Sequence, residues 1–366
     1  MKRRSFIQSA ASLPALASLG ALTRSAVAAE ASRPWANGTE WKTYLITHRV
    51  EVAPADGEAM AWIPLPSVVS DYSRPLGNDW TGNVEMQILR DSRYGPTNML
   101  FAKMPAGKET RWMEVTSRVQ TRDRAVDMSR PQRFEAASAG ELAEYLKATE
   151  LLPTDGIVKA TAQKAVGRAS GDVAKARAIY EWIVDNTFRD PKTRGCGQGD
   201  IKAMLETGNL SGKCADLNAL FVGMSRAAGV PARDVYGLRM NPSQWGYRSM
   251  SASGNVTRAQ HCRAEFYSAQ HGWVPVDPAD VRKVILEEPP GNLKVDDPKV
   301  KLAREKLFGA WEMNWLAYNY SHDLKLPNSK GAALGFLMYP QVETASARKD
   351  PYDPDSVKYI ITAKPA

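Results

Sequence analysis

Residues 212–233 read GKCADLNALFVGMSRAAGVPAR, and this stretch decides the fold. Its apolar side chains recur at i, i+3, i+4 and i+7, the spacing of one helix face: Leu217, Leu220, Phe221 and Met224. A glycine stands just before this periodic segment, and a second glycine followed by a proline stands just after it. These residues are boundary signals in the expected order. The pattern therefore predicts a helix with Cys214 at or within its first turn.

A thiol at a helix start has a distinctive chemistry. The unpaired backbone N–H groups and the helix dipole favour a negative charge there. A thiol loses its proton more easily in such a place, and the thiolate is the nucleophile. Cys214 is therefore a candidate nucleophile. The alternative is a small buried cysteine that packs against the helix start.

Residues 260–278 supply two further candidates. Segments rich in aromatic and β-branched residues flank the turn at 268–272, which predicts a β-hairpin centred near Gln270. This pairing places Asp277 opposite Arg263 or close to it, so His261 and Asp277 lie near the open end, one diagonal step apart. A helix packed on this hairpin would bring Cys214, His261 and Asp277 together as a catalytic triad, which is recognised by geometry and role.

Four motifs resemble the transglutaminase-like superfamily, within the papain-like class of cysteine hydrolases and acyltransferases. They are GKC at 212–214, RAAGVPAR at 226–233, His261 with EFY at 265–267, and GWVPVD at 272–277. The resemblance covers about residues 170–285 and implies an exported bacterial member with an α+β catalytic domain, its helices packed on an antiparallel sheet. It does not determine the reaction, because the superfamily includes cross-linking enzymes, peptidases, amidases and inactive members.

The rest of the chain predicts further domains. Residues 36–130 hold short strands separated by turn residues, which is typical of an antiparallel β-sandwich-like domain. We assign residues 131–286 to the catalytic domain and residues 287–366 to a C-terminal extension packed on the core. Within them we expect a linker from residue 280 onward and a helix over 301–315. The glycine-rich loop 194–200 lacks the G-K-[S/T] of a phosphate loop and is expected to line the cleft. The expected strands are 41–52, 60–66, 83–90, 98–104 and 111–121.

The N-terminus is predicted to be a signal peptide spanning residues 1–28. Arg3 and Arg4 precede a weakly apolar run over 10–22, and small residues at Ala26 and Ala28 suit a signal peptidase. The arginine pair predicts twin-arginine export to the periplasm. A Sec signal stays open, because Lys2 stands where serine or threonine is more usual. The apolar run is too short for a membrane span, so no stable anchor is expected after cleavage.

The net charge of +8 is partly a property of this segment. Residues 1–28 contain four basic residues and no acidic residue, so the mature chain keeps only half of the excess. We therefore infer no nucleic-acid partner from the charge, and no motif predicts a cofactor.

Three cysteines remain: Cys196, Cys214 and Cys262. Export leads to an oxidising compartment, and an odd count leaves at least one thiol free or paired between chains. With Cys214 as the free one, Cys196 and Cys262 could pair, because Cys262 faces away from His261. A zinc site built from the three cysteines and His261 is a competing hypothesis. No C-x-x-C pair is present, so we predict no metal.

The expected chemistry is acyl transfer to a thiol. Cys214 attacks an amide carbonyl, His261 moves the proton, and Asp277 holds the imidazole tautomer. The backbone N–H of Cys214 would be one oxyanion donor, and Asn209 or Gln198 the second, with no choice between them. His271 is a rival base, but its place in the turn predicts a solvated side chain.

The predicted protein is an exported cysteine hydrolase or acyltransferase of amide bonds in peptides, proteins or cell-wall fragments. Peptidase or amidase action is favoured over cross-linking. The alternative is an inactive transglutaminase-like binding or assembly module.

Overall fold

The computed structural model describes residues 40–353 and 356–366. The predicted signal segment 1–28 lies outside these residues. Within them, no helix has the length and apolar character that a membrane span needs.

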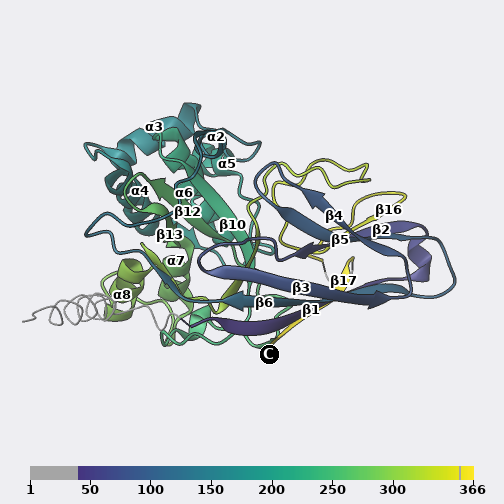
Figure 1. Cartoon of the computed structure of the whole chain (residues 1–366). Coiled ribbons are helices and arrows are strands. Elements are labelled where there is room, and N and C mark those ends of the chain that lie inside the picture. Colours follow the sequence, from purple (N-terminus) through teal and green to yellow (C-terminus); the bar gives the residue numbers. More distant parts are fainter. Residues whose placement is uncertain (1–39, 354–355) are drawn as a thin grey trace, which may run out of the picture. The chain divides into compact units, whose positions relative to one another are not determined.

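Two antiparallel sheets face each other across the first apolar core. Val50 of β1 and Val115 of β6 pack there against Ile63 of β2 and Leu100 of β5. Side chains of β1 alternate between buried and half-buried, the period of a strand with one face on a core. The sheets have the orders β11-β17-β1-β6-β3 and β16-β2-β5-β4 (Figure 1). Their strands are β1 (Lys42–Val52), β2 (Ala59–Leu65), β3 (Ser73–Gly82), β4 (Met86–Asp91), β5 (Thr97–Met104), β6 (Arg111–Thr121), β11 (Gly254–Asn255), β16 (Gln341–Thr344) and β17 (Lys358–Pro365).

Strand β3 was not expected from the sequence, which places turn residues at 77–78 and 82. The strand pairs with β6 at the edge of its sheet, and its register shifts between Pro75 and Gly77. Proline is tolerated on an edge strand, and a bulge accommodates the glycine. The turn residues thus mark an irregular edge strand.

A third antiparallel sheet, with four strands in the order β13-β12-β10-β15, packs against the helices. The predicted hairpin is confirmed: β12 (Arg263–Ser268) pairs with β13 (Gly272–Val276), with Ala264 opposite Val276. The helix α6 (Cys214–Ala227) packs on this sheet, where Phe221 contacts Phe266 of β12. The other elements here are α2 (Ala139–Glu144), α3 (Gly156–Val166), α4 (Asp172–Asn186), α5 (Ile201–Thr207), β10 (Ala232–Arg239), β15 (Trp315–Asn319), the 3₁₀ turn η2 (Arg248–Met250), and the short strand pairs β8 (Phe188–Arg189) with β9 (Ser211–Gly212) and β7 (Arg124–Ala125) with β14 (Ala310–Trp311). The 3₁₀ turn η1 (Pro54–Asp56) connects β1 and β2.

Two expectations after the hairpin were wrong. The expected linker is the helix α7 (Pro278–Glu287), which begins with Pro278 at its first position and Asp277 as its N-cap. The expected helix over 301–315 is α8 (Pro298–Lys306), and the chain then enters β14 and β15. All five residues of β15 are buried, so this strand has no two-residue period to reveal it.

The C-terminal segment contributes to every large sheet. Strand β15 forms an edge of the helical part's sheet, β17 pairs with β1, and β16 pairs with β2. The architecture is α+β with antiparallel main sheets, which confirms the predicted fold class.

Candidate active site

Helix α6 begins at Cys214, as its periodicity predicts. The Asp216 carboxylate accepts a hydrogen bond from the backbone N–H of Lys213 at 2.9 Å, which fixes the helix start. The next backbone N–H, that of Ala215, donates to the carbonyl of Cys196 at 2.9 Å. Cys214 is 3% exposed. Its thiol is therefore held at a helix start, where the dipole favours the thiolate.

The glycine-rich loop is attached to the same carboxylate. Asp216 Oδ1 accepts from the backbone N–H groups of Gln198 at 3.0 Å and Gly199 at 2.9 Å. A Cβ atom on Gly197 would lie 1.8 Å from Asp216 Oδ2, and Gly197 has a φ of +93°. Glycine is therefore required here by both space and backbone. The prediction that this loop lines the cleft is confirmed, since Cys196 forms part of the cavity wall.

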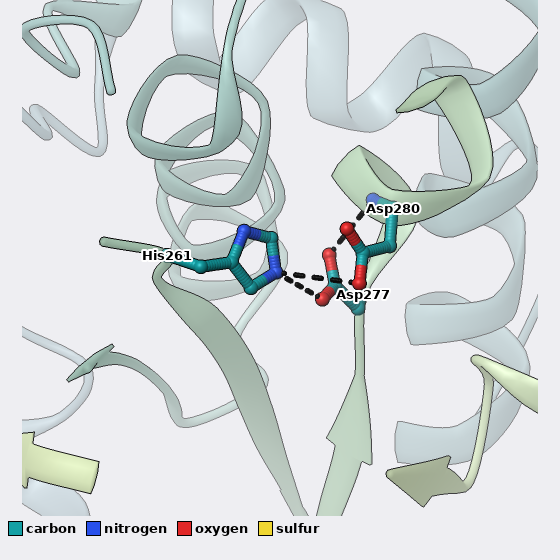
Figure 2. A group of neighbouring side chains, drawn as sticks. All are labelled: His261, Asp277 and Asp280. Carbon is teal, nitrogen blue, oxygen red and sulfur yellow. Dashed lines mark hydrogen bonds and ion pairs between the residues drawn. The ribbon is translucent and has the colours of Figure 1, made fainter. Parts of the chain in front are cut away.

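His261 lies just before β12 and is held through its backbone on two sides. Its N–H donates to the carbonyl of Gly237 on β10 at 3.0 Å, and its carbonyl accepts from the Trp315 indole of β15 at 2.7 Å. The Nε2 atom of His261 lies 2.7 Å from Asp277 Oδ2 (Figure 2). The other ring nitrogen, Nδ1, points away from the carboxylates. It remains available for the thiol.

Asp277 is also tied to the cysteine helix. Asn218 lies one turn after Cys214 on α6, and its Nδ2 donates to Asp277 Oδ1 at 3.2 Å and to the Cys262 carbonyl at 2.8 Å. Asn218 is fully buried. Sequence reasoning missed this residue, although a polar residue four positions after the nucleophile shares its helix face.

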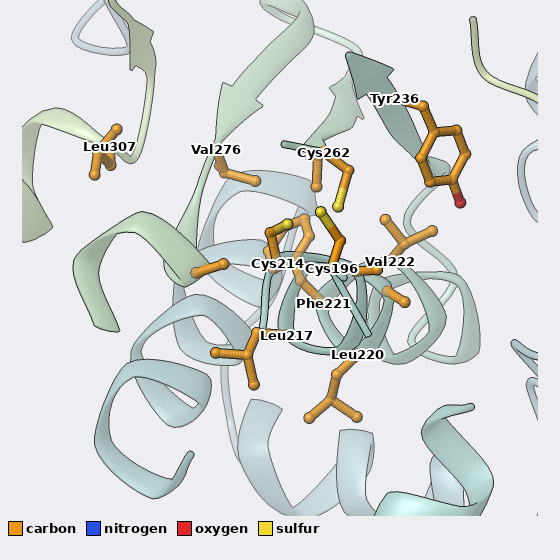
Figure 3. Close-up of a cluster of buried hydrophobic side chains, with 14 of the residues drawn as sticks. Cys196, Cys214, Leu217, Leu220, Phe221, Val222, Tyr236, Cys262, Val276 and Leu307 are labelled. Atoms are coloured by element: carbon orange, nitrogen blue, oxygen red, sulfur yellow. The ribbon is translucent and has the colours of Figure 1, made fainter. Parts of the chain in front are cut away.

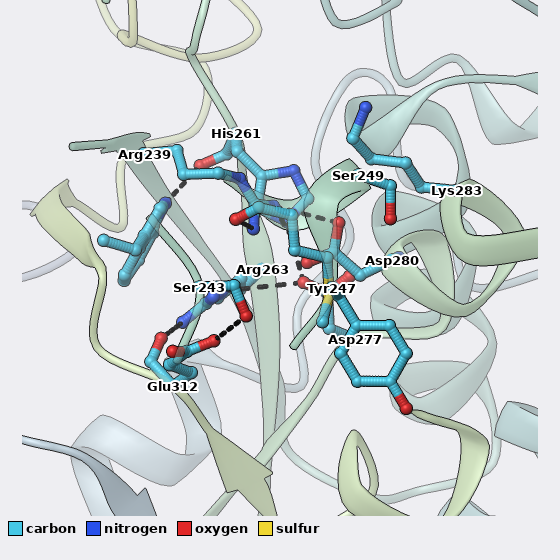
Figure 4. Close-up of polar contacts among 12 residues, drawn as sticks. Arg239, Ser243, Tyr247, Ser249, His261, Arg263, Asp277, Asp280, Lys283 and Glu312 are labelled. Atoms are coloured by element: carbon cyan, nitrogen blue, oxygen red, sulfur yellow. Dashed lines mark hydrogen bonds and ion pairs between the residues drawn. The ribbon is translucent and has the colours of Figure 1, made fainter. Parts of the chain in front are cut away.

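Asp280 is a second carboxylate beside the histidine, and it was also missed. Its Oδ2 lies 3.5 Å from His261 Nε2, and its backbone N–H donates to Asp277 Oδ1 at 3.0 Å. Arg239 binds both Asp280 oxygens, at 2.9 and 2.8 Å (Figure 4). Arg263 Nε lies 3.6 Å from Asp277 Oδ2. Two buried carboxylates thus face two buried guanidinium groups around one imidazole.

These charges set the protonation of the imidazole. Burial alone would lower the pKa of His261, but the carboxylates of Asp280 and Asp277 outweigh it and raise that pKa. Burial and the charge of Asp280 raise the pKa of Asp277, while His261 and Arg263 act in the opposite direction. Burial alone would raise the pKa of Asp280, but Arg239 and the other cationic neighbours together outweigh it, so this pKa lies below its ordinary value. The imidazolium form is therefore stabilised.

Three buried thiols meet at the helix start (Figure 3). Contact with Cys196 is the largest cause that holds the pKa of Cys214 well below its ordinary value, followed by contact with Cys262; the His261 ring also lowers it, and burial opposes. The pKa values of Cys196 and Cys262 are raised well above ordinary, for Cys196 first by contact with Cys214 and for Cys262 first by burial. Of the three thiols, that of Cys214 therefore loses its proton most easily.

The cysteines do not form the disulfide that we considered. All three are free thiols, and Cys196 and Cys262 each interact with Cys214. The Cys196 thiol also donates to the carbonyl of Gln260 at 3.1 Å.

A cavity of about 500 Å³ contains Cys214, His261 and Cys196. Its other walls come from the 249–260 loop, Lys283 of α7 and the C-terminal residues 339, 351–352 and 357–359. This volume lies in the range of small-ligand sites.

The remaining predicted residues lie elsewhere. Gln198 and Asn209 are exposed, and neither lines this cavity. Asn209 Oδ1 accepts from the backbone N–H of Ser211 at 3.2 Å. The solvated state expected for His271 is wrong, because it is 6% exposed and its Nδ1 lies 3.1 Å from the Ser268 hydroxyl.

Ligand atoms of His261, Asp277 and Asp280 lie within 4.8 Å of one another, a spacing that could hold a metal ion. Arg239 and Arg263 already place two positive charges against these carboxylates, and a cation would be repelled by them. The donor set therefore fits a hydrogen-bonded charge network better than a metal centre.

Comparisons with known proteins identify the family of this chain. The family model of the transglutaminase-like superfamily matches residues 159–278. An uncharacterised protein of Haemophilus influenzae is 36% identical over 327 residues, which cover 85% of this chain and 87% of that protein. The chain belongs to the transglutaminase-like superfamily.

A solved structure with a TM-score above 0.5 shows a similar fold. A candidate cysteine protease from Cytophaga hutchinsonii gives a TM-score of 0.52 at 15% identity, covering 89% of this chain and 98% of its own. The periplasmic domain of TgpA from Pseudomonas aeruginosa gives a TM-score of 0.35 at 14% identity, covering 74% of this chain and 94% of its own.

Proposed function

We propose that this protein is an exported cysteine hydrolase that cleaves amide bonds through Cys214, His261 and Asp277. The observation that carries the proposal is the position of His261. Its Nε2 is 2.7 Å from Asp277, and its ring interacts with a thiol whose pKa is lowered. A nucleophile, a base and a group that orients the base are the parts needed for covalent acyl transfer.

In the proposed reaction, the Cys214 thiolate attacks the amide carbonyl carbon. The imidazolium of His261 gives its proton to the leaving amine as the C–N bond breaks, which leaves a thioester on Cys214. His261 then takes a proton from water, and the hydroxide attacks the thioester. The C–S bond breaks, the carboxylic acid is released, and the Cys214 thiolate and the His261 imidazolium are restored. Asp277 keeps the Nε2–H tautomer throughout, so that Nδ1 serves the thiol and the water.

The oxyanion needs two donors. The backbone N–H of Cys214 is one, since it makes no hydrogen bond to another described residue. The substrates of this proposal are peptides, proteins or cell-wall amides in the periplasm, with no nucleic-acid partner and no membrane anchor after signal removal. Water is the proposed acceptor of the acyl group.

Incubating the mature protein with peptide and cell-wall fragment libraries tests the proposal, with mass spectrometry of the products. Wild type should release new amino and carboxyl ends, whereas Cys214→Ala and His261→Ala should release none while keeping the wild-type circular dichroism spectrum. Asp277→Asn should lower kcat by about 10⁴ because the wrong tautomer is held. Cleavage that survives Cys214→Ala would contradict the proposal. Products joined through a new amide bond would indicate transfer to amines instead of hydrolysis.

A further inference from the structure

The walls of the active-site cavity carry one sign of charge. None of the described residues that line it is an aspartate or a glutamate. Six of them are basic: Arg189, Lys213, Arg239, Arg258, Lys283 and Lys358. A cleft lined by one sign of charge raises the local concentration of ligands of the other sign.

Nearby carboxylates neutralise only part of this charge. Asp280 pairs with Arg239, and Glu51 pairs with Lys358 at 2.6 Å. A single carboxylate, that of Glu287, is shared by Arg189 and Lys283.

Two of the basic residues have no ion pair among the described residues. The Lys213 ammonium donates a hydrogen bond to the carbonyl of Thr193 at 2.7 Å. Arg258 makes no ion pair with any residue that the structure describes. The cavity therefore keeps an excess of positive charge after pairing.

The cations also crowd one another. Burial lowers the pKa of Lys283, and the charges of Arg189 and Arg239 lower it further, against the raising effect of Glu287. An anionic group in the cavity would relieve this repulsion.

The unpaired cations flank the two reacting residues along the chain. Lys213 immediately precedes Cys214, and Arg258 lies three residues before His261. Both basic side chains line the cavity that also holds Cys214 and His261. A carboxylate that meets them would thus share this cavity with the amide bond at Cys214.

We propose that the cavity binds carboxylate groups of its substrate, so that the enzyme selects amide bonds with an acidic residue or a free carboxyl end close by. This inference rests on the proposed function for its catalytic part. Its binding part stands on the charge of the cavity alone, because a thiol is not needed to attract an anion.

Peptide binding to the Cys214→Ala protein tests the inference without requiring turnover. The probes are fluorescein-labelled pentapeptides AEAEA and AQAQA, each with a free or an amidated carboxyl end, followed by fluorescence anisotropy. The Glu peptide should bind about tenfold more tightly than the Gln peptide, since two or three partly exposed charge pairs contribute factors of about 2 to 5 each. Comparing amidated AEAEA with amidated AQAQA isolates the effect of the side-chain carboxylates. Comparing the free and amidated forms of AQAQA isolates the effect of the terminal carboxylate.

Charge variants locate the effect. Arg258→Gln and Lys358→Gln, made in the Cys214→Ala protein, should each weaken Glu-peptide binding by about 2- to 5-fold and leave binding of the amidated Gln peptide unchanged. Lys103→Gln removes the same charge from an exposed position on β5 and should change neither. Raising the salt to 0.5 M should reduce the preference, because it screens exposed charges.

Equal affinity for all four peptides, or binding of none, would overturn the inference. It would also be overturned if the charge variants keep the preference and the same substitutions, made in the protein that retains Cys214, shift the pH dependence of Cys214 alkylation, since the cations would then serve the thiolate. A clear Glu preference in a protein that cleaves nothing would instead refute the proposed hydrolase and support a binding module.

Discussion

Replacing Asn218 by alanine tests how the Asp277 carboxylate is held in place. The substitution removes two buried hydrogen bonds, at 2.8 Å to the Cys262 carbonyl and at 3.2 Å to Asp277 Oδ1. A bond to a neutral group contributes about 0.5–1.5 kcal/mol and one to a charged group about 1.5–3 kcal/mol. The Oδ1 atom of Asn218 is buried and has no hydrogen-bond partner among the described residues, which destabilises the folded protein. Alanine has no such atom, so the substitution removes this destabilising contribution. We therefore expect the free energy of unfolding to fall by about 2 kcal/mol, the lower end of that range.

Activity should fall as well. Asp277 keeps its bond from the Asp280 N–H, but it loses the link to the helix that carries Cys214. A rise of 1.4 kcal/mol in the barrier lowers kcat about tenfold, and we expect a loss of this size with KM unchanged.

Urea unfolding and steady-state kinetics measure the two effects. The control is Asn186→Ala, which removes a bond of equal length, 2.8 Å, to a carbonyl at an exposed helix end and should cost under about 0.5 kcal/mol. If Asn218→Ala unfolds like the control and keeps its kcat, Asn218 does not position Asp277, and the described linkage between helix and acid is wrong.

Three further outcomes follow from the sequence and the structure. Because the pKa of Cys214 is held well below that of an ordinary thiol, with the help of His261, iodoacetamide should alkylate Cys214 much faster near neutral pH than it alkylates a free cysteine. His261→Ala should move the pH profile of this alkylation to higher pH, and an unchanged profile would contradict the pairing. Arg3→Lys combined with Arg4→Lys should leave uncleaved precursor in the cytoplasm on fractionation, whereas full export would indicate a Sec signal. Gly197→Ala places a methyl group inside the carboxylate that fixes the start of α6, so thermal unfolding should show a large loss of stability, and a wild-type Tm would contradict the described loop.

Local patterns were sufficient for the elements that carry the candidate triad. The helix from Cys214 has one apolar face and boundary residues at both ends. The hairpin has alternating strands around a short turn, so its pairing could be counted to place His261 beside Asp277. Both signals come from residues close together in the sequence, where periodicity reports directly on backbone geometry.

Fully buried and polar segments carried weaker signals. Strand β15 is buried on both faces and therefore shows no alternation. Helix α7 was missed because the prolines at 289, 290 and 298 suggested a linker, although Asp277 followed by Pro278 is also a helix start.

Only the tertiary structure decided the surroundings of the triad. The link from Asn218 to Asp277 spans 59 residues, and the ion pair of Arg239 with Asp280 spans 41. The basic wall of the cavity combines residues from 189 to 358, including C-terminal residues beside β17. A local pattern states which face of an element is apolar, but it does not state which distant segment will cover that face. The elements that carry the candidate nucleophile, base and orienting carboxylate were therefore predictable from the sequence, whereas the charge of the cavity around them depends on how the chain packs.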